Sequence, residues 1–483
     1  MAAPSTLTKA ICCGALPLLI VFAPTAAARR SPPITSIRVS GPDPYASCPL
    51  ATSLGSTEYP GSAVQPSVAI DPTTEINGRV TLVGVWQQDR WSDGGSQGIV
   101  AARSDDGGLS WRETALPFSR CAAGGGPFNR ASDSWISIGP DGLVYASAVA
   151  ASAAPGEASA TLDGVEVAVS RDAGRTWSEA QILPGSVNHG DGARILVDPS
   201  SPGVAYAVWG KAFQPRSGGL AFTAAVSRTG DGGKTWSAPH DVVLRSPGHR
   251  DGGSIYLAIS PHGQMLYDVT PVFRTVHAHG AVHVHELIGE TTSRDHGRTW
   301  SPTHFIARVR LPTVFPPVRA MEHVQATIDP VSGHLYVVWE DARFSGGTYA
   351  GLAISSSKNG GGTWSTPQEI PSPAGDEIFG PSLAVTTGGA VGVAYYTLPQ
   401  SAGKPLSAPT QYWLSISHDH ARHFDQPTPL GGPFDPKRAP LNGSFLGDYQ
   451  GLAAGASFYP FFAMANPPGI VNSTDVFASA ISP

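Results

Sequence analysis

Apolar and polar residues alternate along most of this chain in short runs separated by turn residues, which is the pattern of antiparallel β-strands. Residues 65–71 (QPSVAID), 80–86 (VTLVGVW) and 98–103 (GIVAAR) predict three such strands, and a fourth begins at Trp111. The polar segment between the second and third strands, QQDRWSDGGSQ, is predicted as a loop. Later segments such as QATIDP, LYVVWEDAR and YAGLAIS repeat the same order of strands.

A turn of the form Ser-x-Asp-x-Gly-x-Thr-Trp follows the third strand of each unit. Its copies end at Trp111, Trp177, Trp236, Trp300 and Trp364, with a decayed copy ending at Phe424, and they lie 59 to 66 residues apart. Hydroxyl and carboxylate groups at these positions bond nearby backbone N–H groups, and glycine supplies a conformation that other residues resist. The turns are therefore interpreted as structural, with the indole packing into its own unit or the next.

A repeat of this length is one supersecondary unit used many times. Four short antiparallel strands per unit predict an all-β fold, a β-propeller of four-stranded blades. After Phe424 only three strands remain, in DYQGLAAGA, SFYPFFAMA and DVFASAIS. The segment ITSIRVS, residues 34–40, can supply the missing fourth strand and close the ring, which removes open sheet edges. The sequence thus favours seven blades, with six blades and a C-terminal extension as the alternative.

The first residues have the layout of a cleaved secretory signal. A lysine precedes an apolar stretch of residues 10–22, and small residues follow before Arg29. We expect residues 1–28 to be removed and residues 29–483 to form a single propeller domain that is secreted, without a membrane span and monomeric. Two cysteines remain in that domain, Cys48 and Cys121. Each lies in a connection from an outer strand to the next inner strand, which predicts a disulfide between them, with two separate buried thiols as the alternative.

The formal net charge is −6 and only 14% of the residues are charged. No basic stripe is present, so a nucleic-acid partner is not expected. Polar residues collect where strand one begins and in the loop after strand two, on one face of the ring. The acids at strand starts are Asp133, Asp191, Asp251, Glu322 and Asp448, and the loop residues are Asp89, Arg90, Asp93, Lys211, Arg274, Asp341 and Arg343. They predict a ligand site at a central mouth, although capping of strand ends and ion pairing between blades would also account for them.

Four histidines, His277, His279, His283 and His285, lie in or beside one strand. A metal site there is the weaker interpretation, because no cysteine or carboxylate at ligand spacing accompanies them. A solvated strand face is preferred, and no metal or other cofactor is expected.

The turn sequence resembles the Asp-box, or BNR repeat, of sialidases and related glycoside hydrolases. QPSVAIDP, WQQDRWSDGG, RASDSW, VVWEDAR and FLGDYQGL also look like phrases of bacterial secreted proteins of that kind. The resemblance implies three arginines on a substrate carboxylate, an aspartic general acid, and a tyrosine nucleophile activated by a glutamate. By position, Asp93 is the acid and Arg90 the neighbouring arginine, with Arg274 and Arg343 completing the clamp.

The nucleophile implied by the resemblance is Tyr449, with Tyr395 and Tyr396 as alternatives. Glu322, or else Glu340, is its activating partner. One phrase departs from the family, since sialidases begin the first blade with Arg-Ile-Pro and this chain has Gln65-Pro66-Ser67.

Three hypotheses follow from these residues. The first is a secreted sialidase-like glycoside hydrolase of the exo-α-sialidase type, acting on a glycan at the central mouth. The second is a non-catalytic propeller that binds a surface glycan or protein. The third is a lyase or metal-assisted enzyme that uses the acids Asp133, Asp191, Asp251 and Asp448.

Overall fold

The computed structural model describes residues 36–483 except 49–54, 76–79, 154–160, 188–189, 214–220, 243–248, 252–255, 279–280, 314–317, 320–323, 374–375, 400–408 and 442–444. Residues 34–483 form one compact unit, and the expected signal, residues 1–28, lies outside the described part. That part is almost entirely β-structure, with a short 3-10 helix, η3, at Pro436–Arg438. Within it, no helix is long and apolar enough to cross a membrane.

The strands fall into antiparallel groups that follow one another along the chain. In chain order they are β1 (Ile37–Arg38), β2 (Glu58–Ile70), β3 (Leu82–Trp91), β4 (Ser96–Ser104), β5 (Arg112–Ala115), β6 (Arg130–Ile138), β7 (Val144–Ser152), β8 (Thr161–Ser170), β9 (Gln181–Ile182), β10 (Asp191–Val197), β11 (Ala205–Phe213), β12 (Ala221–Thr229), β13 (His240–Val242), β14 (His249–Asp251), β15 (Tyr256–Ile259), β16 (Leu266–Ala278), β17 (Ala281–Ser293), β18 (His304–Arg308), β19 (Val324–Ile328), β20 (Leu335–Asp341), β21 (Gly351–Ser357), β22 (Gln368–Ile370), β23 (Glu377–Val385), β24 (Val391–Leu398), β25 (Thr410–Ser417), β26 (Thr428–Phe434), β27 (Gly451–Ala454), β28 (Phe458–Ala465) and β29 (Thr474–Ala478).

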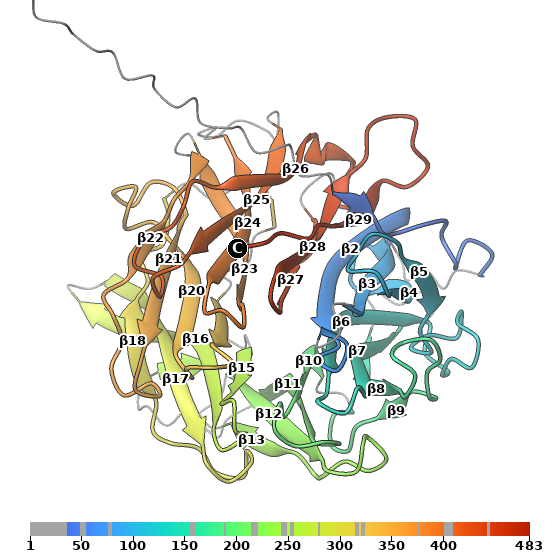
Figure 1. Ribbon diagram of the computed structural model, residues 1–483, viewed down its shortest axis with the longest axis horizontal. Helices are drawn as coiled ribbons and strands as arrows, with labels where there is room; N and C mark the ends of the chain where they lie inside the picture. The colour runs from blue at the N-terminus through green and yellow to red at the C-terminus, as the bar shows by residue number, and fades with distance from the viewer. Residues whose placement is uncertain are drawn as a thin grey trace, which may run out of the picture. The chain divides into compact units, whose positions relative to one another are not determined.

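The groups are arranged as the blades of a propeller around a central axis (Figure 1). Separate sheets are formed by β10–β13, by β14 to β18, by β19–β22 and by β23–β26. One larger sheet joins the groups β27–β29, β2–β5 and β6–β9, and the links between these groups are single residue pairs, Ser62 with Thr474 and Ser96 with Ala131. The innermost strands contact one another in cyclic order, β27, β2, β6, β10, β15, β19, β23 and back to β27.

The two ends of the domain meet in one group of strands. β1 pairs antiparallel with β29, Ile37 opposite Ala478 and Arg38 opposite Phe477, so the N-terminal segment supplies the outer strand to β27–β29. Ser40 Oγ adds a 2.8 Å hydrogen bond to Asp475, which is fully buried. The strand expected at residues 34–40 is therefore present, shortened to two residues.

The Asp-containing turns fold as their side chains predicted. In one copy, Asp231 Oδ1 accepts the backbone N–H of Thr235 at 3.0 Å and Oδ2 accepts its hydroxyl at 2.6 Å. Thr229 Oγ1 accepts from Gly233 N at 3.0 Å, and Gly233 has φ +79°, where a side chain would be strained. The hydrogen bonds from Thr235 lower the pKa of Asp231 to about 2. The same pattern recurs at the other copies, including the decayed one at Asp419.

Packing between neighbouring groups forms the core. Trp86 and Trp111 lie against Phe461 with ring centroids 6.3 and 5.4 Å apart, which joins β27–β29 to β2–β5. Trp209 and Trp339, on the second strands of later groups, are almost wholly buried. Burying such large side chains is the dominant favourable term for a β-ring of this kind.

Two features of the first repeat differ from, or add to, the sequence-based expectation. The segment expected as a loop after the second strand continues β3 as far as Trp91, because Gln87, Gln88, Asp89 and Arg90 are buried and their backbones stay in the ladder. Cys48 and Cys121 are joined by a disulfide with 5.6 Å between their Cα atoms. The bridge ties the segment after β1 to the segment after β5.

Candidate active site at the centre of the ring

Four inner strands carry an irregularity at the same level. In each of these strands the pairing register with the next strand shifts at one point. The shift lies between Val64 and Ser67 in β2, between Ser132 and Trp135 in β6, between Asp191 and Arg194 in β10, and between Phe379 and Ser382 in β23. Each slip contains a residue in the left-handed region, namely Gln65 (φ 52°), Asp133 (φ 50°), Gly192 (φ 61°) and Gly380 (φ 61°). β-Bulges re-aim side chains and are frequent beside active sites, and strained non-glycine residues cluster there too.

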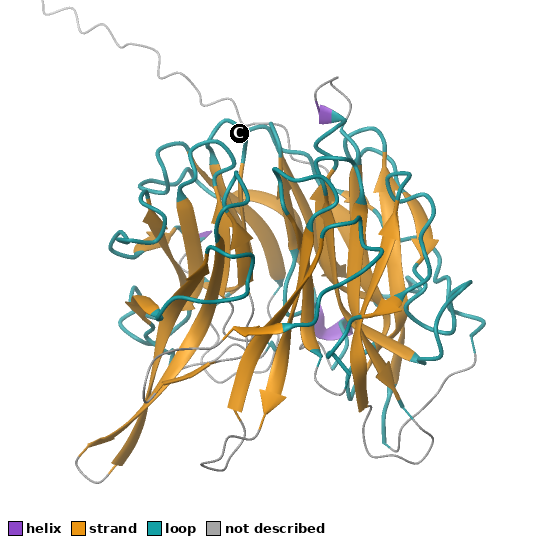
Figure 2. Cartoon of the chain, turned by 90° about the horizontal axis from the view of Figure 1, so that it is seen from below, coloured by secondary structure: helices purple, strands orange, loops and turns teal. Residues whose placement is uncertain are grey.

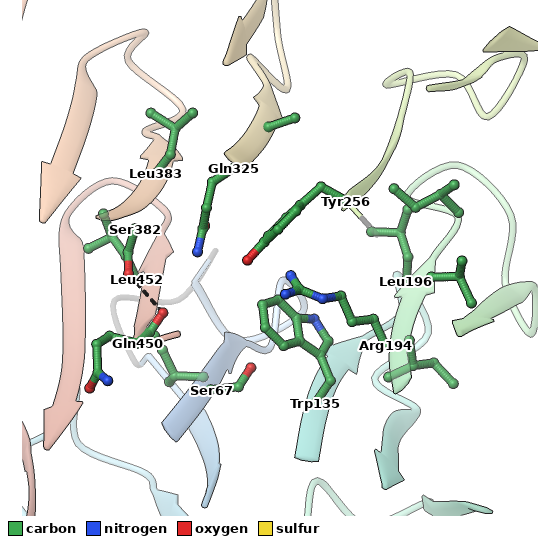
Figure 3. Close-up of a pocket in the computed structure, with 16 residues that line it drawn as sticks. Ser67, Trp135, Arg194, Leu196, Tyr256, Gln325, Ser382, Leu383, Gln450 and Leu452 are labelled. Carbon is green, nitrogen blue, oxygen red and sulfur yellow. Dashed lines mark hydrogen bonds between the residues drawn. The ribbon is translucent and has the colours of Figure 1, made fainter. Parts of the chain in front are cut away.

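The residue just after each slip lines a cavity on the ring axis. Ser67, Trp135, Arg194 and Ser382 do so together with Tyr256, Gln325 and Gln450, and the cavity has a volume of about 160 Å³ (Figure 3). Ser382 Oγ is held by a 2.8 Å hydrogen bond to the backbone carbonyl of Gln450. The bulges therefore turn side chains of different strands toward one space.

Three polar groups in this cavity are buried without a hydrogen-bond partner among the described residues. They are Nη1 of Arg194, the hydroxyl of Tyr256 and Nε2 of Gln325. The Arg194 guanidinium lies over the ring of Tyr256 at 3.6 Å and over that of Trp135 at 4.3 Å, so its position is fixed by cation–π contacts. A buried donor without a hydrogen-bond partner lowers the stability of the folded protein. The three side chains point into the cavity, as Figure 3 shows. They fit a ligand rich in acceptor oxygens.

An acid cluster, called the mouth below, is formed by residues that lie two or three positions before the cavity-lining residues Trp135, Arg194 and Gln450 in the chain. The Nε2 atom of Gln65 donates to Asp133 at 3.3 Å and to Asp448 at 3.1 Å, so a single amide bridges both carboxylates. Burial and the charge of Asp133 raise the pKa of Asp448 to about 6, against the opposing effect of Arg319. Desolvation by the surrounding protein and the charge of Asp133 also raise the pKa of Asp191 to about 6. Two carboxyl groups that exchange protons near neutral pH are suited to acid–base chemistry.

Two arginines complete the mouth. Arg319 is paired with Asp448 at 3.2 Å. Arg90 is buried, and it donates to Gln87 Oε1 at 3.2 Å and to the carbonyl of Gly95 at 3.0 Å. Both guanidinium groups lie over the ring of Phe445, at 4.7 Å for Arg90 and 5.1 Å for Arg319. The mouth thus combines carboxylates with fixed positive charge.

The expected general acid, Asp93, has a different setting. Its Oδ1 lies 2.8 Å from Nη1 of Arg130 and also accepts a hydrogen bond from Ser56. The Arg130 side chain is fully buried and stacks on Trp91 at 4.4 Å. Asp93 therefore serves as the counter-charge of a buried guanidinium.

The three tyrosines named from the sequence are also engaged elsewhere. Tyr449 is buried against Trp135 and donates to the carbonyl of Ser134 at 2.8 Å. Tyr395 donates to the carbonyl of Pro371, and Tyr396 to that of Ala463. Burial raises the pKa of Tyr395, Tyr396 and Tyr449 well above its usual range. Their phenols act as buried donors to backbone.

The remaining expected residues are dispersed. Arg343 is paired with the buried Asp341 at 2.7 Å in a groove lined by β17 and β18, away from Arg90. Arg274 is exposed on β16, opposite His285. Glu322 lies outside the described residues, and of Asp251 only the backbone is described, opposite Val272. Glu340 accepts from the backbone of Gly380 at 3.1 Å.

No group of three or more metal-ligating side chains is found among the described residues. The side chains of His277, His279 and His283 lie outside the description.

Sequence reasoning missed Tyr256, Gln325 and Arg319 as members of this site. Their signal was weak, because each looks like an ordinary polar residue at or near an inner strand. Tyr256 and Gln325 lie at the starts of the inner strands β15 and β19. Asp133 and Asp191 were identified as candidates because they lie at the starts of other inner strands. Extending the search from acids to all polar residues at those positions would have included both.

No known sequence family matches this chain, and no curated protein is similar to it. Several solved structures resemble it. An α-L-arabinofuranosidase of Fusarium graminearum is 14% identical, over 73% of this chain and 92% of its own, with a TM-score of 0.45. The NanB sialidase of Streptococcus pneumoniae is 10% identical over 72% and 67%, with a TM-score of 0.43. An intramolecular trans-sialidase of Ruminococcus gnavus is 13% identical over 87% and 94%, with a TM-score of 0.37. The resemblance of this chain to the sialidase-like superfamily of propeller glycosidases rests on its Asp-box turns, whose hydrogen bonds are present in the structure.

Proposed function

We propose that this protein is an exported glycoside hydrolase that acts at the central cavity of a seven-bladed propeller. The observation that carries the proposal is the meeting of unpartnered donors, Arg194, Tyr256 and Gln325, with an acid cluster whose pKa values are raised toward neutral. Glycoside hydrolysis generally requires two carboxyl groups beside the scissile bond, one protonated and one ionised. The β1–β29 pairing supports the blade count, and the disulfide supports export.

In this proposal Asp448 is the general acid. Its pKa near 6 leaves a useful protonated fraction at the pH of many extracellular settings, and its Oδ1 atom is buried with no partner among the described residues. Asp191 is the partner that accepts a proton. Asp133 stays between them, bound by Gln65, and its charge keeps both pKa values high.

The donors of the cavity would bind the sugar. A guanidinium recognises a carboxylate through two parallel hydrogen bonds, and Arg194 has a free Nη1 for such a contact. Tyr256 lines the cavity and its hydroxyl has no partner among the described residues, so it is our candidate for the tyrosine nucleophile of a sialidase-type reaction. On this basis we propose a carboxylate-bearing sugar as substrate, with an exo-α-sialidase activity as the specific form.

A second function is favoured by one observation. Asp93 and Tyr449, which the family resemblance implied as catalytic, are both consumed by structural contacts. A propeller that only binds glycan would show the same central donors without turnover.

The test is release of a fluorophore from a panel of aryl glycosides, including an α-sialoside and an α-arabinofuranoside, by the mature chain. Asp448→Asn and Tyr256→Phe should each lower kcat by about 100-fold or more. Asp93→Asn is the matched control: it should destabilise the fold, because it leaves Arg130 buried without its counter-charge, while the folded fraction keeps its turnover. Loss of turnover in a stably folded Asp93→Asn, with Asp448→Asn active, would transfer the acid role to Asp93. No turnover of any glycoside, with sugar binding retained, would establish the binding function instead.

A further inference from the structure

A second concavity opens away from the ring axis. It has a volume of about 620 Å³ and is lined by residues of β17 and β18 and of the segments after β18 and β20, among them His285, Arg308, Arg310 and Arg343. We call these four side chains and the space between them the arginine groove. In a chain with formal net charge −6 and 31 basic residues among 483, three guanidinium groups in one concavity are a marked local excess.

Strand register explains how the groove assembles. On β17, His285 and Leu287 lie on one face, and Leu287 is opposite Arg308 of β18. On the other side, His285 is opposite Arg274 of β16. Arg274, His285 and Arg308 therefore share one face of three adjacent strands. The β16–β17 ladder extends well past the neighbouring strands (Figure 2), which carries this face out toward solvent.

The guanidinium groups are held mainly by neutral partners. Arg308 donates to Nδ1 of His285. Arg310 donates to the carbonyl of Gly346 and lies against Gly347, where an added Cβ would approach its Nε to 2.6 Å. Of the three, Arg343 has an ion pair, with Asp341. Glu286, which also borders the groove, is buried. Arg308 and Arg310 are exposed, and no ion pair between either of them and a carboxylate is found among the described residues.

The groove opens on the same face as the central mouth. Arg308 is the last residue of β18, and Arg343 follows the end of β20. Trp91, close to Asp93, is likewise the last residue of β3. In every repeat, these strand ends lie opposite the Asp-containing turns. A sugar chain bound at the mouth and running over this face can therefore pass the arginine groove.

We infer that the arginine groove is an accessory binding site for an acidic polysaccharide, one that carries carboxylate or sulfate groups along its length. This inference rests on the proposed function and makes that substrate a polyanion. Guanidinium forks suit both anions. Among the described lining residues there is no Trp, Tyr or Phe on which a neutral sugar could stack, while Val284 and Leu311, 57% and 38% exposed, add aliphatic surface. Recognition therefore depends on charge.

The test is affinity electrophoresis of the mature protein in gels with polygalacturonate, heparin or neutral dextran. We expect retardation by one or both acidic polymers, weakening as salt rises, and none by dextran. Arg308→Ala/Arg310→Ala should weaken binding at least tenfold. Arg294→Ala/Arg298→Ala, which removes two exposed arginines from the turn of the same blade on the opposite face, should bind like the wild type.

Several results would overturn the inference. Equal binding by wild type and Arg308→Ala/Arg310→Ala would exclude the groove, as would equal loss in both double variants, which would reflect net charge alone. Retardation by poly-glutamate with none by either polysaccharide would make the partner an acidic protein segment. Turnover of small aryl glycosides should be unchanged in Arg308→Ala/Arg310→Ala. Polymer binding without turnover of any glycoside would exclude the hydrolase function but support the polysaccharide-binding role of the groove. Turnover without polymer binding would support the hydrolase function and exclude that role of the groove.

Discussion

Asp448 should make the protein less stable as the pH rises through the mildly acidic range, and Asp448→Asn should remove that effect. In the folded protein, burial and the charge of Asp133 raise the pKa of this carboxyl from 3.8 to about 6. The folded state then binds more protons than the unfolded chain between these two values. Stability contributed by this group is therefore full below pH 3.8 and lost as the pH rises to about 6. The sign is that of a carboxyl whose pKa is raised, because at Asp448 the effect of burial outweighs the ion pair with Arg319.

The magnitude follows from the shift. A difference of about two pH units corresponds to about 3 kcal/mol, at 1.36 kcal/mol per unit. The Asp448 side chain is 20% exposed, so solvent screens it only partly. An asparagine keeps the shape and can still accept one hydrogen bond from Gln65 or Arg319. Relative to wild type, Asp448→Asn should gain about 2.4 kcal/mol in free energy of unfolding between pH 4 and pH 7, because a small part of the effect is already present at pH 4.

The assay is urea denaturation at pH 4 and pH 7, followed by the fluorescence of the protein's 11 tryptophans. Each variant is compared with wild type at the same pH, so carboxyls that do not interact with Asp448 cancel. Asp191, whose pKa is also raised by the charge of Asp448, adds to the difference in the same direction. Glu179→Gln, at an exposed position, should show no such difference. If Asp448→Asn gained no stability relative to wild type between pH 4 and pH 7, or lost stability, the folded protein would not disfavour the ionised form of Asp448 and the reasoning would be refuted.

Further expectations concern the cavity and the scaffold. Tyr256→Phe should leave the melting temperature within a degree or two of wild type while lowering kcat/KM on the best aryl glycoside, because its hydroxyl has no hydrogen-bond partner among the described residues; a large stability loss would give it a structural role. Cys48→Ser should cost about 4 kcal/mol of unfolding free energy, from a closed loop of 73 residues, read by urea denaturation with and without reductant; an unchanged midpoint would mean that the bridge does not constrain the unfolded chain. Asp231→Ala should lower stability by about 1–3 kcal/mol, since both oxygens bond Thr235, and turnover at the opposite face should stay normal.

Much of the architecture could be predicted from local pattern. The repeat of apolar strands and Asp-containing turns is a short-range property, because each turn closes on itself through Asp231 and Thr235 or their equivalents. The leftover strand at residues 34–40 could be assigned because an unpaired strand must find an edge, and it pairs with β29. The extent of β3 was underestimated, since polar residues such as Gln87 and Arg90 read as a loop unless their burial is known.

The site was only partly predictable. The acids Asp133, Asp191 and Asp448 were marked by their place at strand starts. Their raised pKa values come from mutual proximity, which long-range closure of the ring creates. Asp93 looked catalytic in sequence, and only tertiary packing showed Arg130 buried against it. Tyr256 and Gln325 were overlooked because nothing local shows that a side chain lacks a partner.

The sequence by itself determined the repeated unit, the turn chemistry, the edge that closes the ring and the face that carries polar residues. These depend on contacts within one unit or on the need to pair a strand. The tertiary structure decided which polar residues meet, because the central cavity joins side chains from strands that are hundreds of residues apart. It also separated the arginines into two sets: Arg90, Arg194 and Arg319 lie at the axis, and Arg308, Arg310 and Arg343 lie in the groove. The sequence shows which residues are charged, whereas the closed ring decides which charged residues lie close together.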